Sequence, residues 1–115
     1  MTNILIDSDK KLHNLLSKIE DCKEIGLDTE FIRESTYRPI LALIQISLAN
    51  EEIYLIDPQK IKDISGISKI TSDPKIIKII HSAKQDLEAL YSHLGSFPKN
   101  VFDTQIAYNF LSEKS

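Results

Sequence analysis

Residues 24–30, with the sequence EIGLDTE, hold two acidic side chains, Asp28 and Glu30, in a segment whose apolar residues alternate. An alternation of period two predicts a β-strand, so both carboxylates leave the same face of it. The predicted strand ends at Glu30, and two carboxylates at a strand end repel each other unless a cation lies between them. Hard divalent cations such as Mg²⁺ or Mn²⁺ bind carboxylate oxygens of this kind. The alternative for an isolated Asp-x-Glu pair is a solvated strand end.

Predicted strands and helices continue on both sides of this segment, and their order defines the fold class. Strands are predicted at residues 4–6, 40–48, 53–56, 75–81 and 101–102, and helices at 9–19, 61–71, 83–94 and 104–111. Ser8 or Asp9 is predicted to cap the first of these helices, and Asp103 or Thr104 the last. The strands at 24–30, 40–48 and 53–56 can form an antiparallel meander, after which strand, helix, strand and helix follow. This order predicts an α/β protein with a mixed sheet and helices packed on its faces.

The size and charge of the chain limit its possible functions. The 115 residues predict a single domain, and the net charge of −3 argues against a protein that holds nucleic acid by charge alone. That charge does not exclude a nuclease whose carboxylates hold cations. One cysteine excludes an internal disulfide, and three glycines exclude a glycine-rich phosphate loop. No apolar run can span a bilayer and no secretory signal is recognisable, so we expect no membrane partner and a cytoplasmic location.

A third carboxylate, Asp86, lies in the first turn of the helix predicted at 83–94. In a parallel arrangement this helix begins beside the carboxyl end of a neighbouring strand, where open α/β sheets bind their ligands. Asp86 is therefore a candidate to meet Asp28 and Glu30 around a metal ion. The alternative is a favourable negative charge at a helix N-terminus with no further role.

Four segments in this order resemble the front part of the ribonuclease D family. They are GLDTEFIRESTYRPILALIQIS (26–47), YLIDP (54–58), IIHSAKQDLEAL (79–90) and VFDTQIAY (101–108). Members of that family are 3′–5′ exonucleases of the DEDD superfamily with a ribonuclease H-like fold. The resemblance covers roughly residues 1–112, and it implies a three-layer α/β architecture.

The resemblance also implies the chemistry of the site. Asp28 and Glu30 match the first exonuclease motif of the family, and Asp86 matches the second. The implied reaction is phosphodiester hydrolysis with two Mg²⁺ or Mn²⁺ ions. The implied substrates are the 3′ ends of single-stranded RNA, and the sequence leaves DNA open because no residue recognisably reads a 2′-hydroxyl group.

Six further residues are predicted to contact the substrate. Phe31 would stack on the terminal bases, as aromatic side chains do on single strands, although a core phenylalanine is an equal alternative. Thr29 leaves the opposite strand face and would act through its backbone. His81 closes the strand at 75–81 and resembles a family position near the second motif. The other three, in the loop after the first motif, would bind phosphate or stack, or form a solvated loop: Arg33, Tyr37 and Arg38.

The resemblance ends before the third motif of the family, in which a tyrosine is followed four residues later by an aspartate. Here Tyr108 is followed at that spacing by Ser112, and the chain ends at Ser115. Residues 1–115 are therefore expected to form one partial exonuclease domain, incomplete at its C-terminus. The alternative to an active nuclease is a catalytically inactive nucleic-acid-binding remnant. A sheet face left open by the missing helices predicts a homo-oligomer.

Overall fold

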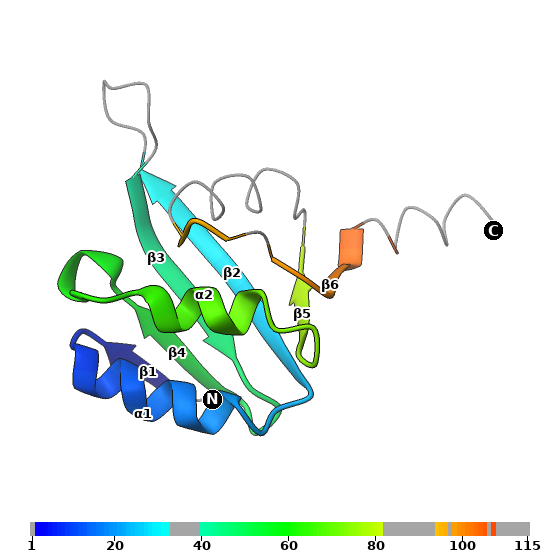
Figure 1. Ribbon diagram of the computed structural model, residues 1–115, viewed down its shortest axis with the longest axis horizontal. Helices are drawn as coiled ribbons and strands as arrows, with labels where there is room; N and C mark the ends of the chain where they lie inside the picture. The colour runs from blue at the N-terminus through cyan, green and yellow to red at the C-terminus, as the bar shows by residue number, and fades with distance from the viewer. Residues whose placement is uncertain (1, 33–39, 82–93, 97, 106, 108–115) are drawn as a thin grey trace.

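The computed structural model describes residues 2–32, 40–81, 94–96, 98–105 and 107. These residues form one six-stranded sheet with helices beside it (Figure 1). The strands are β1 (Thr2–Ile6), β2 (Glu24–Ile32), β3 (Ile40–Ser47), β4 (Glu52–Ile56), β5 (Ile77–Ile80) and β6 (Val101–Asp103). The helices are α1 (Asp9–Ile19), a 3₁₀ helix η1 (Pro58–Lys60) and α2 (Ser65–Thr71). Asp86, Arg33, Tyr37 and Arg38 lie outside the described residues.

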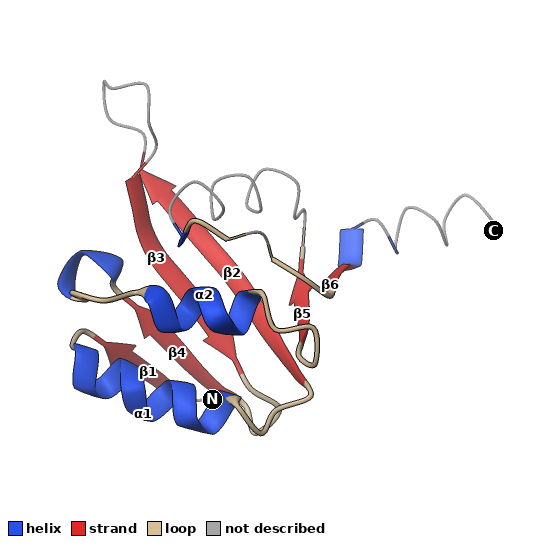
Figure 2. Cartoon of the chain, in the orientation of Figure 1, coloured by secondary structure: helices blue, strands red, loops and turns tan. Residues whose placement is uncertain are grey.

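The strand order in the sheet is β1-β4-β3-β2-β5-β6 (Figure 2). Strands β2, β3 and β4 pair antiparallel, which confirms the predicted meander. Strand β5 pairs parallel to β2, β6 pairs parallel to β5, and β1 pairs parallel to β4. The predicted mixed α/β sheet is therefore confirmed, and Asp28 and Glu30 lie on β2, an interior strand.

Helices α1 and α2 both cover one face of this sheet, and the hydrophobic core lies between them and the strands (Figure 1). The two helices approach closely, because a β-carbon added at Gly66 of α2 would lie 2.3 Å from Cδ1 of Leu16 of α1. The buried apolar side chains are Ile6, Leu12, Leu15, Ile19, Ile25, Leu27, Leu41, Ile44, Ile46, Tyr54, Ile56, Ile61, Ile67, Ile70, Ile76 and Ile80. The opposite face of the sheet carries the acidic pair. None of the described helices is long and apolar enough to cross a membrane.

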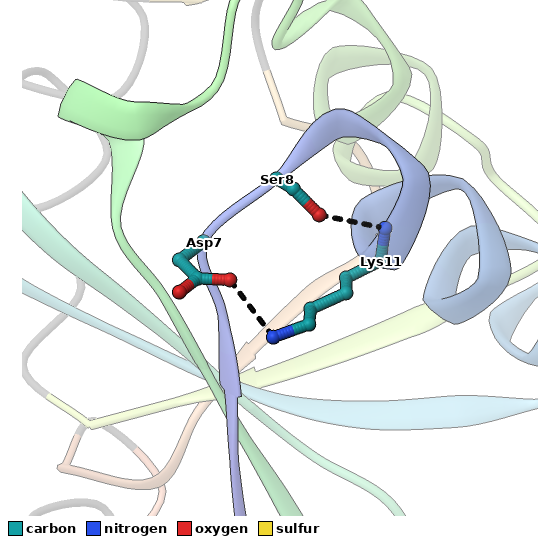
Figure 3. Close-up of polar contacts among 3 residues, drawn as sticks. All are labelled: Asp7, Ser8 and Lys11. Carbon is teal, nitrogen blue, oxygen red and sulfur yellow. Dashed lines mark hydrogen bonds and ion pairs between the residues drawn. The ribbon is translucent and has the colours of Figure 1, made fainter.

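The start of α1 follows from three polar residues in sequence order. Oγ of Ser8 accepts a hydrogen bond from the Lys11 backbone N–H at 3.3 Å, which makes Ser8 the N-cap (Figure 3). Nζ of Lys11 also forms an ion pair with Oδ1 of Asp7, four residues earlier in the chain, at a distance of 2.9 Å (Figure 3). Of the two predicted caps, Ser8 and Asp9, these contacts confirm Ser8, and they fix the point at which the chain turns from β1 into α1.

Replacing Ser8 by alanine is expected to lower the free energy of unfolding by about 1 kcal/mol, because the capped N–H loses its acceptor. Urea denaturation followed by circular dichroism measures the loss. Ser17→Ala is the control: Ser17 is exposed on the same helix, and its hydroxyl donates to the His13 carbonyl and caps no backbone N–H. An unchanged urea midpoint for Ser8→Ala would show that water replaces the cap without cost.

The helix predicted at 61–71 begins only at Ser65. The Asp9 carboxylate accepts hydrogen bonds from the backbone N–H groups of Lys62 at 2.9 Å and Asp63 at 3.0 Å. These bonds lower the pKa of Asp9 and hold the chain before α2 against the start of α1. Asp63 in turn accepts from the N–H of Ser65 at 3.0 Å. These bonds between side chains and backbone cannot be recognised from the apolar periodicity of the sequence. The prediction therefore placed the start of the helix too early.

Candidate functional site

Asp28 and Glu30 lie side by side on the sheet face opposite α1 and α2. Both side chains are exposed. Leu27, which precedes the pair, and Thr29, which lies between its two members, are buried on the face toward the helices. The common face of the two carboxylates agrees with the alternation in the sequence. Their predicted place at the end of the strand is wrong, because β2 continues to Ile32. The pair therefore stands on the surface of the sheet, and not on its rim.

A hollow of about 340 Å³ adjoins Asp28 on this face. The described residues that line it are Gly26, Leu27, Asp28, Gln45, Ser47, Ile79, Ile80, His81 and Thr104. Gln45 of β3 pairs with Asp28 in the sheet register, so the two side chains share the face. Nδ1 of His81, after β5, lies 2.9 Å from Oγ1 of Thr104, after β6. The hollow therefore brings polar groups of β3, and of the residues that directly follow β5 and β6, beside one carboxylate of the pair.

The ligand chemistry of the acidic pair suits a hard divalent cation. Oδ1 of Asp28 accepts a hydrogen bond from the Thr29 backbone N–H at 2.9 Å, which holds the carboxylate in place. Within the part of the chain that the structure describes, neither Asp28 nor Glu30 forms an ion pair. Carboxylate oxygens are the donors that Mg²⁺ and Mn²⁺ prefer. In the same part of the chain, no three His, Cys, Asp or Glu side chains converge as a metal site.

The other described residues predicted to contact substrate take different positions. His81 is exposed and lines the hollow beside Asp28. Thr29 is 8% exposed and turned toward the core, and its N–H is taken up by Asp28. Phe31 is half-buried and packs against the core from the face opposite Asp28. The substrate contacts of these three residues stay predictions.

The hydroxyl of Thr29 has no hydrogen-bond partner among the described residues, although its oxygen is buried. Replacing Thr29 by valine removes this unpaired group while keeping the branched shape. We expect Thr29→Val to raise the free energy of unfolding by about 1 kcal/mol, because an unsatisfied buried hydroxyl is costly. Urea denaturation checks this expectation, with Thr71→Val as the contrast, since Oγ1 of Thr71 donates to the Ser68 carbonyl. A destabilised Thr29→Val would mean that the hydroxyl has a partner in solution.

Three polar residues that line the hollow were not predicted as site residues: Gln45, Ser47 and Thr104. Gln45 and Ser47 are two residues apart in the strand ILALIQIS, so their polar side chains leave the same face of it. That spacing is the sequence signal that could have identified them. Thr104 follows Asp103, whose Oδ1 accepts from the Gln105 N–H at 2.9 Å and so caps the next turn. The cap role predicted for Asp103 or Thr104 is thus confirmed for Asp103.

Comparisons with known proteins identify the architecture that carries this site. A sequence profile described as a 3′–5′ exonuclease matches residues 3–115. Ribonuclease D of Desulfotalea psychrophila is 46% identical over 110 residues, covering 87% of this chain and 29% of that protein. Ribonuclease D of Escherichia coli is 40% identical, and its crystal structure matches 92% of this chain and 28% of its own with a TM-score of 0.85. The catalytic core of RRP6 from Trypanosoma brucei is 26% identical, with a TM-score of 0.82 over 91% of this chain and 29% of that one.

The mixed sheet with its central acidic strand is thus a ribonuclease H-like exonuclease fold, which bears out the predicted fold class. The chain spans less than a third of the length of these ribonuclease D relatives. It belongs to the ribonuclease D family of 3′–5′ exonucleases, within whose exonuclease domain the match lies.

Proposed function

We propose that this chain contributes to a 3′–5′ exoribonuclease that removes nucleotides from RNA 3′ ends. The observation that carries the proposal is the exposed pair Asp28 and Glu30 on the central strand of a ribonuclease D fold. The Escherichia coli relative is described as an exoribonuclease involved in structured RNA processing. The family membership and the carboxylate face support the same chemistry, with DNA as the other candidate substrate.

In this proposal Asp28, Glu30 and Asp86 hold the two Mg²⁺ or Mn²⁺ ions. When bound, the ions supply activation of the attacking water and stabilisation of the leaving 3′ oxygen. Asp28 is held for this task by the N–H of Thr29. His81 and Gln45, which line the hollow next to Asp28, would contact the terminal nucleotide. Arg33, Tyr37 and Arg38 are proposed to bind the RNA backbone and bases.

A second candidate function is an inactive module that binds nucleic acid without cleaving it. One sequence observation favours it, because none of the four tyrosines in the 115 residues is followed four positions later by aspartate. In the family that aspartate completes the metal site, and the tyrosine positions the attacking water. When these 115 residues are tested alone, they supply three of the four acidic ligands, and we expect slow turnover at best.

A denaturing-gel time course separates the two functions. A 5′-labelled single-stranded RNA is incubated with the chain in Mn²⁺, in Mg²⁺ and in EDTA, and a DNA strand of the same sequence is run beside it. A metal-dependent ladder that shortens from the 3′ end supports the nuclease. Retarded migration of uncut RNA on a native gel, with no ladder at any metal concentration, supports the binding module.

The predicted homo-oligomer remains a proposal, and apolar groups on the carboxylate face are its basis. Leu5 and Phe102 are each 51% exposed and Ile77 is 38% exposed. Register places all three on the same face as Asp28. Sedimentation velocity at rising concentration is expected to show self-association that Phe102→Ser weakens. A monomer with a cooperative melt at every concentration would contradict this expectation.

A further inference from the structure

Strand β1 is the outer strand of the sheet, and a groove runs along it on the side of α1. The groove measures about 510 Å³. Its described lining is Asn3, Ile4, Leu5, Ile6, Lys11, Asn14, Leu15, Lys18 and Tyr54. Strands β4 and β3 lie between β1 and β2 in the sheet (Figure 1). Asp28 is on β2, so the groove is separate from the carboxylate site. Nothing in the exonuclease chemistry uses this edge.

The backbone of β1 presents hydrogen-bonding groups to this edge. The carbonyl of Ile6 accepts from the Asp57 N–H at 3.1 Å, so Ile6 faces β4. N–H and C=O groups alternate sides along a strand, and those of Asn3 and Leu5 therefore point away from the sheet. Among the described residues, no strand pairs with this outer edge. It is thus a template for one more strand.

The sequence of β1 does nothing to block such pairing. Its five residues, TNILI, contain no charge and no proline, which are the usual means of protecting an edge strand. Leu5 is 51% exposed on one face, and Ile4 faces the groove on the other. A strand added here would bury aliphatic side chains at alternate positions.

The charge around the groove determines which kind of strand fits. Of the nine described lining residues two are lysines and none is acidic, in a chain of net charge −3. Lys11 is already paired with Asp7, whereas Nζ of Lys18 donates to the Tyr54 hydroxyl at 3.2 Å. Among the described residues no carboxylate lies within ion-pair distance of Lys18, although the Glu52 carboxylate also acts to raise its pKa. Lys18 lies 5.7 Å from the centre of the Tyr54 ring, and its pKa is raised by that hydrogen bond. The cation is therefore positioned over the groove.

We propose that the groove along β1 binds an extended, acidic peptide segment of a partner protein as an additional strand of the sheet. A second copy of this chain fits less well, because two β1 strands paired about a two-fold axis would bring both copies' Lys11 and Lys18 onto one side of the sheet. A nucleic acid fits less well too, because it lacks the alternating N–H and C=O pattern that Asn3 and Leu5 present.

The test uses the fluorescein-labelled peptide Asp-Val-Thr-Val-Thr-Val-Glu and fluorescence polarisation. The matched peptide carries lysine at both ends, and we expect it to bind at least about tenfold more weakly. Asn3→Pro removes an outward N–H without touching the bonds to β4, so the acidic peptide should lose about tenfold in affinity. Lys18→Glu should reverse the preference between the two peptides, and Lys69→Glu on α2 should change nothing.

Circular dichroism melts establish that each variant is folded, and Lys18→Glu tests the proposal independently of the proline. The proposal is overturned if neither peptide binds, or if Asn3→Pro binds the acidic peptide as the wild type does. Competition between a single-stranded RNA and the acidic peptide would also overturn it, if Lys18→Glu abolishes that competition and Asn3→Pro leaves it unchanged. A dimer in sedimentation that Asn3→Pro dissolves would assign the edge to a second copy instead.

Discussion

Asp28→Asn is expected to slow metal-dependent shortening of RNA by about 100-fold or more, because it removes one charged ligand of the proposed metal site. The substitution is nearly isosteric, and the asparagine oxygen can still accept from the Thr29 N–H. Asp28 is exposed, so the free energy of unfolding should stay within about 0.5 kcal/mol of the wild type. A large loss of activity with unchanged stability is the signature of a ligand, as opposed to a structural residue.

The control for this experiment is Glu24→Gln on the same strand. Glu24 is exposed and has the parity of Asp28, but it lies four residues, or roughly 13 Å, before it. Its replacement should leave both activity and stability unchanged. Mn²⁺ binding, followed by the electron paramagnetic resonance signal of the free ion, gives the same comparison where turnover is slow. Equal Mn²⁺ affinity of the wild type and Asp28→Asn would contradict the assigned metal site.

Lys78→Ala is expected to lower the free energy of unfolding by about 3 kcal/mol. Lys78 is fully buried on the core face of β5, between Ile25 of β2 and Val101 of β6. Its Nζ donates to the carbonyl of Asp73 and, at 3.0 Å, to the carbonyl of Lys99. Alanine would leave a cavity in place of the aliphatic stem and two carbonyls without their donor.

Two further variants show how much of this loss of stability comes from the ammonium group and whether it is specific to the buried lysine. Lys78→Met keeps the aliphatic stem and removes the ammonium group, so its loss should be smaller than that of Lys78→Ala. Lys75→Ala removes an exposed lysine just before β5 and should cost no more than about 0.5 kcal/mol. Urea denaturation of the three variants measures the differences. A Lys78→Ala variant with wild-type stability would contradict the prediction, because the buried lysine would then make no contribution to the free energy of unfolding.

The same lysine predicts a pH dependence of stability. Burial lowers the pKa of Lys78 below its ordinary value of 10.5, and the Asp73 carboxylate opposes this shift in part. Between the lowered pKa and 10.5 the unfolded chain binds more protons than the folded one, so stability rises with pH across that window. The stability difference between the wild type and Lys78→Met should therefore shift in favour of the wild type toward pH 10.5. A difference that does not change with pH would contradict this cause.

Local patterns were enough to predict most of the fold. Alternation in EIGLDTE placed Asp28 and Glu30 on one face, and Ser8 marked the start of α1, because both effects act within a few residues. Asp103 marked a helix cap for the same reason. The start of α2 was predicted wrongly because Asp9, more than fifty residues away, binds the backbone before it.

The sequence by itself therefore determined the fold class, the family and the first acidic pair, since motif spacing and apolar periodicity are local properties of the chain. Only the tertiary structure decided that β1 lies at the outer edge, that Gln45 faces Asp28, and that Lys78 is buried. Each of these depends on which strands pair and in which register. Strand pairing joins distant residues through backbone hydrogen bonds, which every residue type except proline can make, and so it leaves little trace in the sequence.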